Sequence, residues 1–290
     1  MTRPRGFATW NPQRKARALI QSVKAILGDY QDQLPLTLRQ VFYIAVTRAI
    51  IGKTENDYTR LCEYLVRARR AQLIPMDSFR DDGFTLGDSR GWHGPDQFIY
   101  NVMRWVDDFT LDRQEGQDTR MIVWCEAQGM VPQLKRVADD YSVPVYSSGG
   151  FDSLTAKHMV AEQISQSDGG VEVLHLGDHD PSGVHMFGSL DEDVCSFIDH
   201  YGGEVDFTRL AVTPDQVSQF NLPTAPPKVT DNRRFNGALT TQCEALDPAT
   251  LARILRDGIE SRQDATIRQA VVDREADSRD ELRRRFSLAS

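Results

Sequence analysis

The chain has 290 residues, 40% of them hydrophobic and 26% charged, a composition typical of a soluble globular protein with room for two domains. No stretch approaches the roughly 20 apolar residues that cross a bilayer, and the N-terminal segment lacks the apolar core of a secretory signal. We therefore expect no membrane partner and a cytoplasmic location. The four cysteines form no CxxC pair, which argues against structural zinc and disulfides.

Charge is distributed unevenly along the chain. The net charge is −8, yet residues 1–75 carry 13 Lys and Arg against 5 Asp and Glu, and the acidic excess lies in residues 76–290. Such asymmetry indicates a basic module that contacts a polyanion, joined to an acidic module. Chance segregation of surface charge is the alternative.

The N-terminal module is predicted to be helical. Residues 13–28 have a helical pattern and belong to an N-terminal extension that spans residues 1–34. Thr37 and Gln40 have the spacing of a capping box, so they open a second helix, which is expected to reach residue 51.

A third helix is predicted to begin at Thr54 and to have a basic side. Two short amphipathic helices with a tight turn and a basic flank are typical of a winged helix-turn-helix of the CAP type. We assign this domain to residues 35–115, with the wing and loops in residues 76–118 and a linker helix around residues 97–109. The predicted DNA contacts are Lys53, Arg60, Arg67, Arg69 and Arg70.

Tyr43 lies in the second predicted helix, away from the apolar stripe of that helix. At about 100° per residue it is roughly 120° or more from the stripe near Leu38 and Phe42, and it shares a side with Arg39. We therefore expect this tyrosine to lie outside the core. A phenol is a weak nucleophile until a neighbouring cation or metal stabilises its anion, which Arg39 could do. The alternative is a tyrosine that packs at the edge of a DNA-binding helix.

The second module alternates strands and helices. The predicted strands are 121–127, 143–148, 171–177 and 205–212, and the predicted helices between them are 131–140, 152–164 and 184–200. Strands joined by helices of this length form a parallel sheet covered on both faces, which indicates a Rossmann-like α/β domain over residues 116–258. Residues 259–290 are predicted to be a charged helical tail.

Three carboxylates are expected at one edge of this sheet. Glu126 ends the first strand, and Asp178 and Asp180 follow the third strand in "GDHDPSG". Ligands bind at the carboxyl ends of parallel strands, and three acids with no interleaved Lys or Arg repel one another unless a cation holds them. Oxygen ligands favour Mg²⁺, which can position a phosphodiester. The alternative is a polar turn in which the aspartates only cap a helix.

Two further patterns carry no predicted chemistry. His175, His179 and His185 straddle a strand end and a turn, with spacings unlike those of a compact zinc motif. Residues 47–54 end like a phosphate-binding P-loop, but they lack its first glycine and follow a helix rather than a strand. We therefore expect neither a zinc site nor an ATPase.

Three motifs in this order resemble a known family. They are "LTLRQVFYIAV" in the predicted helix-turn-helix, "VWCEAQG" at the end of the first strand and "GDHDPSG" after the third strand. The chain resembles the A subunit of type IIB topoisomerases (topoisomerase VI), the related meiotic double-strand-break protein and their small stand-alone bacterial and plasmid relatives. Further similar segments at 147–159 and 242–255 extend the resemblance over roughly residues 35–260.

The resemblance implies a winged-helix domain with a catalytic tyrosine and a Toprim domain that binds Mg²⁺. By position in the motifs, Tyr43 would be the nucleophile and Arg39 would support it or the scissile phosphate. Glu126, Asp178 and Asp180 would bind the metal, and Glu126 would also act in proton transfer. Attack by Tyr43 on double-stranded DNA would leave a 5′-phosphotyrosyl bond and a free 3′-hydroxyl. In the family the protein is a homodimer, in which one protomer's tyrosine reaches the other's metal site.

The resemblance leaves more than one function open. Strand passage in the family needs a separate GHKL ATPase subunit, so we expect DNA cleavage and rejoining by this chain and a nucleoid-associated location. A Toprim nuclease that hydrolyses DNA with metal-activated water, with Tyr43 only structural, is the first alternative. A non-catalytic DNA-binding protein is the second.

Overall fold

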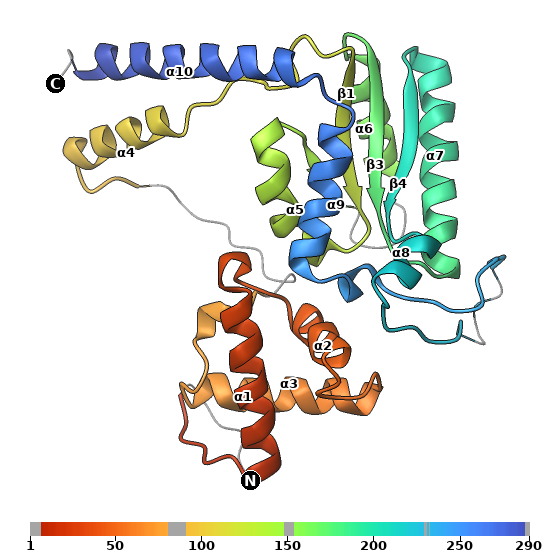
Figure 1. The fold of residues 1–290 in the computed structure, drawn as a ribbon. Coiled ribbons are helices and arrows are strands. Elements are labelled where there is room, and N and C mark those ends of the chain that lie inside the picture. The colour runs from red at the N-terminus through yellow and green to blue at the C-terminus, as the bar shows by residue number, and fades with distance from the viewer. Residues whose placement is uncertain (1–6, 81–90, 148–153, 229–230, 232, 288–290) are drawn as a thin grey trace.

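A computed structural model describes residues 7–80, 91–147, 154–228, 231 and 233–287 of the chain. The N-terminal part is a helical domain, and the rest is built around one parallel sheet (Figure 1). The helical domain faces the end of the sheet domain at which the strands terminate (Figure 1).

The helical domain has three main helices around one apolar core. They are α1 (Arg14–Asp29), α2 (Leu38–Thr47) and α3 (Glu55–Arg70). The predicted capping box is present: the Thr37 hydroxyl accepts from the Gln40 main-chain N–H at 3.1 Å, and the Gln40 side chain accepts from the Thr37 N–H at 2.9 Å. Helix α2 ends four residues before the predicted residue 51, since Ala49 has a φ of 53°, which a helix cannot continue through.

The predicted wing is not seen among the described residues. Residues 81–90 of that prediction lie outside the described part of the chain, and no strand occurs in 71–80 or 91–118. The described part of this region holds a 3-10 turn, Met76–Ser78, and the helix α4 (Pro95–Asp107), which matches the predicted linker helix. The described residues of this domain are therefore helical.

The sheet domain confirms the predicted mixed α/β architecture. Four parallel strands occur in the order β2-β1-β3-β4. They are β1 (Thr119–Cys125), β2 (Val145–Tyr146), β3 (Gly170–Leu176) and β4 (Val205–Ala211). The second strand is shorter than predicted, because only two residues of its apolar run pair with β1.

Helices cover both faces of the sheet, as a parallel sheet requires. Helices α5 (Val131–Ala138) and α9 (Pro248–Glu260) pack on one face, and α6 (Leu154–Ser165) and α7 (Pro181–Tyr201) on the other (Figure 1). Alternate strand residues supply the two cores, with Val123 facing α5 and α9, and Trp124 facing α6 and α7. A short helix that the sequence did not predict, α8 (Pro214–Gln219), follows β4.

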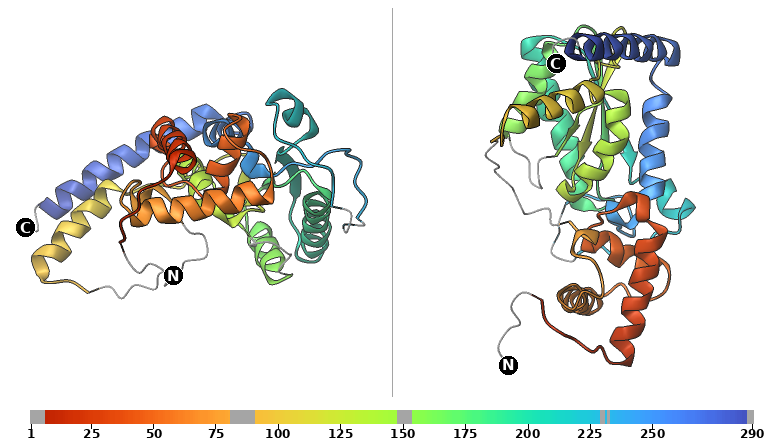
Figure 2. Two further views of the ribbon diagram at one scale, coloured as in Figure 1. Left: turned by 90° about the horizontal axis from the view of Figure 1, so that it is seen from below. Right: turned by 90° about the vertical axis from the view of Figure 1, so that its left-hand side faces the viewer.

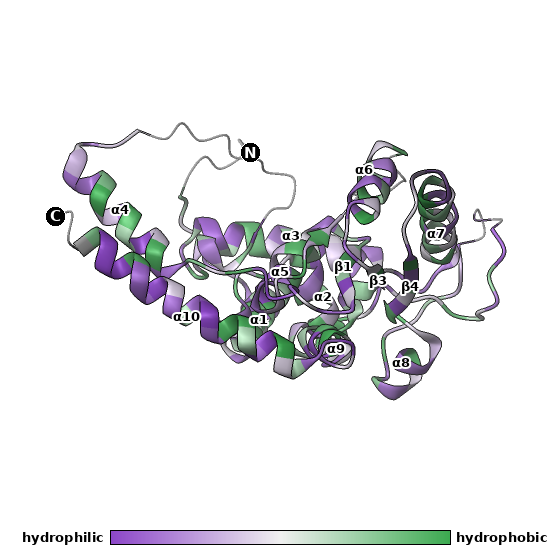
Figure 3. Ribbon diagram, turned by 90° about the horizontal axis from the view of Figure 1, so that it is seen from above, coloured by the Kyte–Doolittle hydropathy of each residue, from purple (hydrophilic) through white to green (hydrophobic). Residues whose placement is uncertain are grey.

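The predicted charged tail is the helix α10 (Ala265–Ser287). It lies beside α4, and the two helices extend together away from the sheet (Figures 1 and 2). Hydrophilic residues predominate along α10 (Figure 3). Within the described ranges, no helix combines the length and apolarity needed to cross a membrane.

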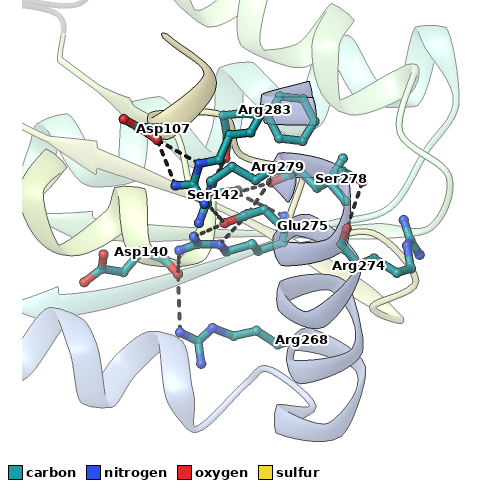
Figure 4. A network of polar contacts seen from close by, with 12 residues as sticks. Asp107, Asp140, Ser142, Arg268, Arg274, Glu275, Ser278, Arg279 and Arg283 are labelled. Carbon is teal, nitrogen blue, oxygen red and sulfur yellow. Dashed lines mark hydrogen bonds and ion pairs between the residues drawn. The ribbon is translucent and has the colours of Figure 1, made fainter. Parts of the chain in front are cut away.

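Glu275 anchors α10 to the segment before β1 (Figure 4). Its side chain is 3% exposed and accepts from Arg113 Nη2 at 2.8 Å, Arg279 Nη2 at 2.6 Å and the Leu111 N–H at 3.1 Å. The hydrogen bonds from Arg113 are the main cause that lowers the pKa of Glu275. The carboxylate is therefore stabilised in its charged form in the folded protein.

Glu275→Gln is expected to lower the free energy of unfolding at pH 7 by about 3 kcal/mol, since it removes a buried charge and leaves the half-buried Arg113 and Arg279 without their charge partner. Because the folded pKa of Glu275 is lowered, its contribution is fully present above the ordinary carboxyl pKa of about 4.3 and is lost as the pH falls through the lowered value. Urea unfolding at pH 7 and below pH 4 should therefore show a large difference between variant and wild type that shrinks in acid.

Glu115→Gln is the matched control for this variant. Glu115 pairs with Arg274 at 2.7 Å, but both side chains are more than half exposed, so its loss should change stability by less than about 1 kcal/mol. Equal effects of the two substitutions would contradict the anchoring role of Glu275.

Candidate active site at the carboxyl end of the sheet

Strand pairing places Glu126 and Asp178 at the same edge of the sheet. Cys125 is paired with Leu176, so the next residues of both strands emerge together. The Glu126 N–H donates to the Leu176 carbonyl at 2.9 Å, and the Asp178 N–H donates to Glu126 Oε2 at 2.9 Å. The predicted meeting of these two carboxylates at the strand ends is therefore present.

Each of the two aspartates also accepts a main-chain hydrogen bond. Asp178 Oδ1 accepts from the Cys243 N–H at 2.8 Å, and Asp180 Oδ1 accepts from the Gly183 N–H at 2.7 Å, which caps α7. Asp180 thus has the capping role that was the alternative reading of this turn. Across the described part of the chain, no three His, Cys, Asp or Glu side chains stand as a preformed metal site.

Two glycines make room for the Glu126 side chain. A Cβ on Gly177 would lie 2.7 Å from Glu126 Oε2, and one on Gly183 would lie 2.3 Å from the Asp178 carbonyl and 3.0 Å from Glu126 Oε2. Any larger residue at either position would displace the carboxylate or the turn. The glycines of "GDHDPSG" therefore serve the close approach of Glu126 to the turn.

Burial, and after it the charges of neighbouring carboxylates, raises the pKa values of Glu126 and Asp178. Burial is the main cause that raises the pKa of Glu126 to about 7, and Asp180 and Glu244 add to it. Burial also raises the pKa of Asp178, followed by the charges of Glu244 and Glu126. Partly buried carboxyl oxygens that repel one another are a donor set suited to a hard divalent cation.

Arg209, a half-buried residue of β4, lies beside the turn that holds Asp178 and Asp180. Its guanidinium donates to the main-chain oxygens of Gly177 at 3.1 Å, of Gly183 at 3.3 Å and of Asp178. The arginine therefore holds the turn that carries the aspartates through their carbonyl groups.

Glu244 is a site residue that the sequence analysis missed. It is 9% exposed and lies in the 3-10 turn Cys243–Ala245 (η5), far along the chain from the other acids. His179 and Thr241 exchange main-chain hydrogen bonds at 2.9 and 3.0 Å. This bridge brings η5 to the turn that holds Asp178 and Asp180. The only sequence signal was the position of Glu244 inside 242–255, a segment noted for its resemblance alone.

A cavity of about 570 Å³ between the two domains contains three of the acids. It is lined by Thr37, Leu38, Arg39, Tyr58, Arg69, Phe79, Arg80, Glu126, Ala127, Gln128, Gly129, Asp178 and Glu244. Arg39 Nη1 lies 3.9 Å from Glu244 Oε1. This cavity therefore combines acids from the sheet domain with arginines from the helical domain.

Tyr43 is buried, so the expectation of a tyrosine outside the core was wrong. The residue is 6% exposed and belongs to the apolar core of the helical domain. The reason is that α2 packs on α1 and α3 on one side and on η5 on the other, whereas the helical pattern reveals only one apolar stripe.

The Tyr43 hydroxyl nevertheless meets polar groups of the sheet domain. It donates a hydrogen bond to Gln242 Oε1. Burial is the largest cause that raises the pKa of Tyr43, and Glu244 adds to it, while Arg39 acts to lower it. The phenol is therefore held neutral in this conformation.

Tyr43 and Asp180 line a second pocket, of about 430 Å³. Its lining residues are Tyr43, Lys53, Asp180, Pro181, Ser182, Ala225, Pro226, Lys228, Asp231, Arg233, Thr240, Thr241 and Gln242. Lys53 Nζ lies 5.6 Å from the centre of the Tyr43 ring and donates to the Pro223 carbonyl at 2.8 Å. Lys53 is thus at the domain boundary rather than on an open basic face.

The contact between α2 and η5 separates the two pockets. Tyr43 and Gln242 line one pocket, and Arg39 and Glu244 line the other. The predicted site residues are therefore neighbours divided into two groups: Arg39, Glu126 and Asp178 in the larger cavity, and Tyr43 and Asp180 in the smaller pocket.

The other predicted DNA contacts lie on α3. Arg60 pairs with Asp57, and the Arg67 guanidinium lies 5.9 Å from the centre of the Trp10 ring. The Arg69 guanidinium lies 5.1 Å from the centre of the Phe79 ring. Arg69 also lines the larger cavity, which contains the three acids Glu126, Asp178 and Glu244. Arg70 is half-buried in the last turn of α3.

Comparison with known proteins assigns no family: the chain matches no model of a protein family and no curated protein. A functional assignment therefore depends on the chemistry of these two pockets and on the motifs that supply their residues.

Proposed function

We propose that the chain is a metal-dependent DNA-cleaving enzyme of the topoisomerase VI A type, with a winged-helix domain followed by a Toprim domain. In this proposal Tyr43 attacks a DNA phosphodiester. The observation that carries it is the 430 Å³ pocket, in which a phenol, two carboxylates and three cationic side chains meet. Those are the groups that phosphoryl transfer to a tyrosine requires.

The proposed reaction is a transesterification. The Tyr43 oxygen forms a bond to phosphorus and the bond from phosphorus to the 3′-oxygen breaks, which leaves a 5′-phosphotyrosyl link and, after protonation, a 3′-hydroxyl. Gln242 accepts the phenol hydrogen bond but cannot take the proton, because an amide oxygen is too weak a base. A carboxylate must therefore accept it, and Asp180 shares the pocket.

Other residues of the two pockets would bind the DNA phosphates and the metal ion. Lys53, Lys228 and Arg233 would bind the backbone phosphates, and Arg39 acts to lower the pKa of the phenol. Glu126, Asp178 and Asp180 would hold Mg²⁺. When bound, the cation would neutralise the charge that develops on the phosphate and on the leaving oxygen.

The partners in this proposal are double-stranded DNA and, for cutting both strands, a second copy of the chain. A separate GHKL ATPase subunit would be needed for strand passage. The basic α3 and the charged pockets favour a location on the nucleoid, and binding should weaken steeply with salt.

A second function is favoured by one specific observation. Glu126, Asp178 and Glu244 share the 570 Å³ cavity, and Tyr43 does not line it. Metal-dependent hydrolysis by water in that cavity would use these acids and leave Tyr43 as a core residue. Cleaved DNA that never becomes attached to protein would select this nuclease activity.

Removal of metal tests both functions at once. Labelled supercoiled DNA incubated with the protein and Mg²⁺, then denatured, is expected to give covalent adducts that disappear with EDTA and return when Mg²⁺ is added in excess. Adducts that persist in EDTA would contradict the metal assignment. Tight DNA binding without cleavage in Mg²⁺, Mn²⁺ or Ca²⁺ would identify a binding protein instead.

A further inference from the structure

Two polar contacts join α2 to η5 and to the residue just before it. The Tyr43 hydroxyl donates to Gln242 Oε1. One turn earlier on α2, Arg39 Nη1 lies 3.9 Å from Glu244 Oε1. Residues four apart in a helix lie on the same side of it, so both contacts are made by one face of α2. A separation of α2 from η5 would therefore break both of them.

In this arrangement the phenol is not ready to attack DNA. Tyr43 is only 6% exposed, so little of its side chain is open to a DNA strand. Its hydroxyl proton is directed at the amide oxygen of Gln242, which is too weak a base to accept it. Burial also raises the pKa of Tyr43. The helix α2 must therefore move relative to η5 before the phenol can act.

Arg39 is the part of the α2–η5 contact that DNA can reach. Its side chain is 53% exposed, whereas that of Glu244 is 11% exposed. Their separation of 3.9 Å is beyond hydrogen-bonding distance. A DNA phosphate can accept two hydrogen bonds from a guanidinium, and its negative charge repels a carboxylate. A phosphate bound to Arg39 would therefore weaken the contact between α2 and η5.

We infer that the α2–η5 contact is autoinhibitory: it holds the Tyr43 phenol in a resting position until a DNA phosphate binds Arg39. The inference depends on the proposed tyrosine chemistry, since it concerns release of the attacking phenol. It applies equally to attack within one chain and to attack across a dimer, because the phenol must leave Gln242 in both cases.

Opening this contact uses part of the energy of DNA binding. When DNA binds only molecules in which α2 has separated from η5, the apparent affinity is reduced in proportion to the fraction of such molecules. Loss of one hydrogen bond between neutral groups changes that fraction by about fivefold. A variant that lacks the Gln242 amide should therefore expose Tyr43 more often and bind DNA more tightly, both by about fivefold.

Gln242→Met tests the inference, because methionine keeps the length of the side chain and removes the amide oxygen. Exposure of Tyr43 is measured by nitration of the full chain with tetranitromethane, without DNA or metal, followed by trypsin and mass spectrometry of residues 40–48. Tyr100, which is 64% exposed and is the single tyrosine of the tryptic peptide 91–104, is the internal reference. DNA affinity is measured with a short duplex in EDTA.

In wild type, Tyr43 should be nitrated about tenfold or more slowly than Tyr100, since it reacts only after local opening. Gln242→Met should narrow this difference by about fivefold and tighten DNA binding by the same factor. Gln219→Met, the same substitution at an exposed position of α8, should leave both values as in wild type. A folded Gln242→Met that matches wild type in both would overturn the inference, as would greater exposure of Tyr43 without tighter binding.

Gln242→Ala is the second variant, judged by the same outcomes, should the methionine variant fail to fold. Adduct formation in Mg²⁺ at limiting DNA separates the inference from the proposed function. The folded variant should form adducts about fivefold faster than wild type. Slower formation would give Gln242 a positioning role and overturn the inference. Wild type that forms no adduct would end the proposed function, whereas nitration and affinity would still show whether the contact opposes DNA binding.

Discussion

Replacing Tyr43 with phenylalanine is expected to abolish covalent DNA adducts, with a loss of about a thousandfold or more, because the substitution removes the attacking oxygen. Denaturing electrophoresis with end-labelled DNA measures this directly. The variant also loses the hydrogen bond to Gln242, which should lower stability by about 1 kcal/mol, too little to unfold the chain.

Tyr64→Phe is the matched control. Tyr64 belongs to the same helical domain and packs on Trp10 at a ring separation of 6.0 Å, away from both pockets. This variant should form adducts at the wild-type level. Cleavage that survives Tyr43→Phe unchanged would exclude Tyr43 as the nucleophile and favour hydrolysis in the larger cavity.

Asp178→Asn is expected to reduce cleavage by about a hundredfold or more while DNA binding is kept. An asparagine retains the oxygen that accepts from Cys243 but removes one of several charges that repel Glu126 and Glu244. Without metal, the variant should therefore be at least as stable as wild type. Loss of activity can then be separated from loss of fold.

Thermal unfolding with Mg²⁺ adds a readout that does not depend on activity. A cation that binds only the folded protein raises its unfolding temperature. Mg²⁺ should therefore raise the unfolding temperature of wild type, and much less that of Asp178→Asn. Asp206→Asn, an exposed acid near the start of β4 at the opposite edge of the sheet, should behave as wild type. Equal Mg²⁺ responses of all three proteins would contradict a metal site at Asp178.

The sheet domain was predictable because its signals are local. Apolar runs such as 171–177 between helical patterns are enough to predict a parallel sheet, and in a parallel sheet the strand ends meet at one edge. That is why Glu126 and Asp178 could be placed together from the sequence. The patterns overestimated α2 and β2, because the left-handed backbone at Ala49 ends the helix and only two residues of β2 pair with β1.

The candidate site was only partly predictable, because residues of both domains line its two pockets. Tyr43 appeared polar-facing on a helical wheel, yet the sheet domain covers that face of α2. Glu244 has no flanking pattern that marks it, and only the bridge between His179 and Thr241 brings it to the acids. Periodicity reports which face of a helix is apolar, not what a second domain places against it.

Peptide mapping of the covalent adduct tests the tyrosine chemistry most directly. Trypsin releases residues 40–48, "QVFYIAVTR", which contain Tyr43 as their single tyrosine. After exhaustive nuclease digestion of DNA cleaved in Mg²⁺, mass spectrometry should find this peptide with a nucleotide joined through phosphate to Tyr43. Cut DNA with no modified peptide, or a nucleotide on any other residue, would contradict the account.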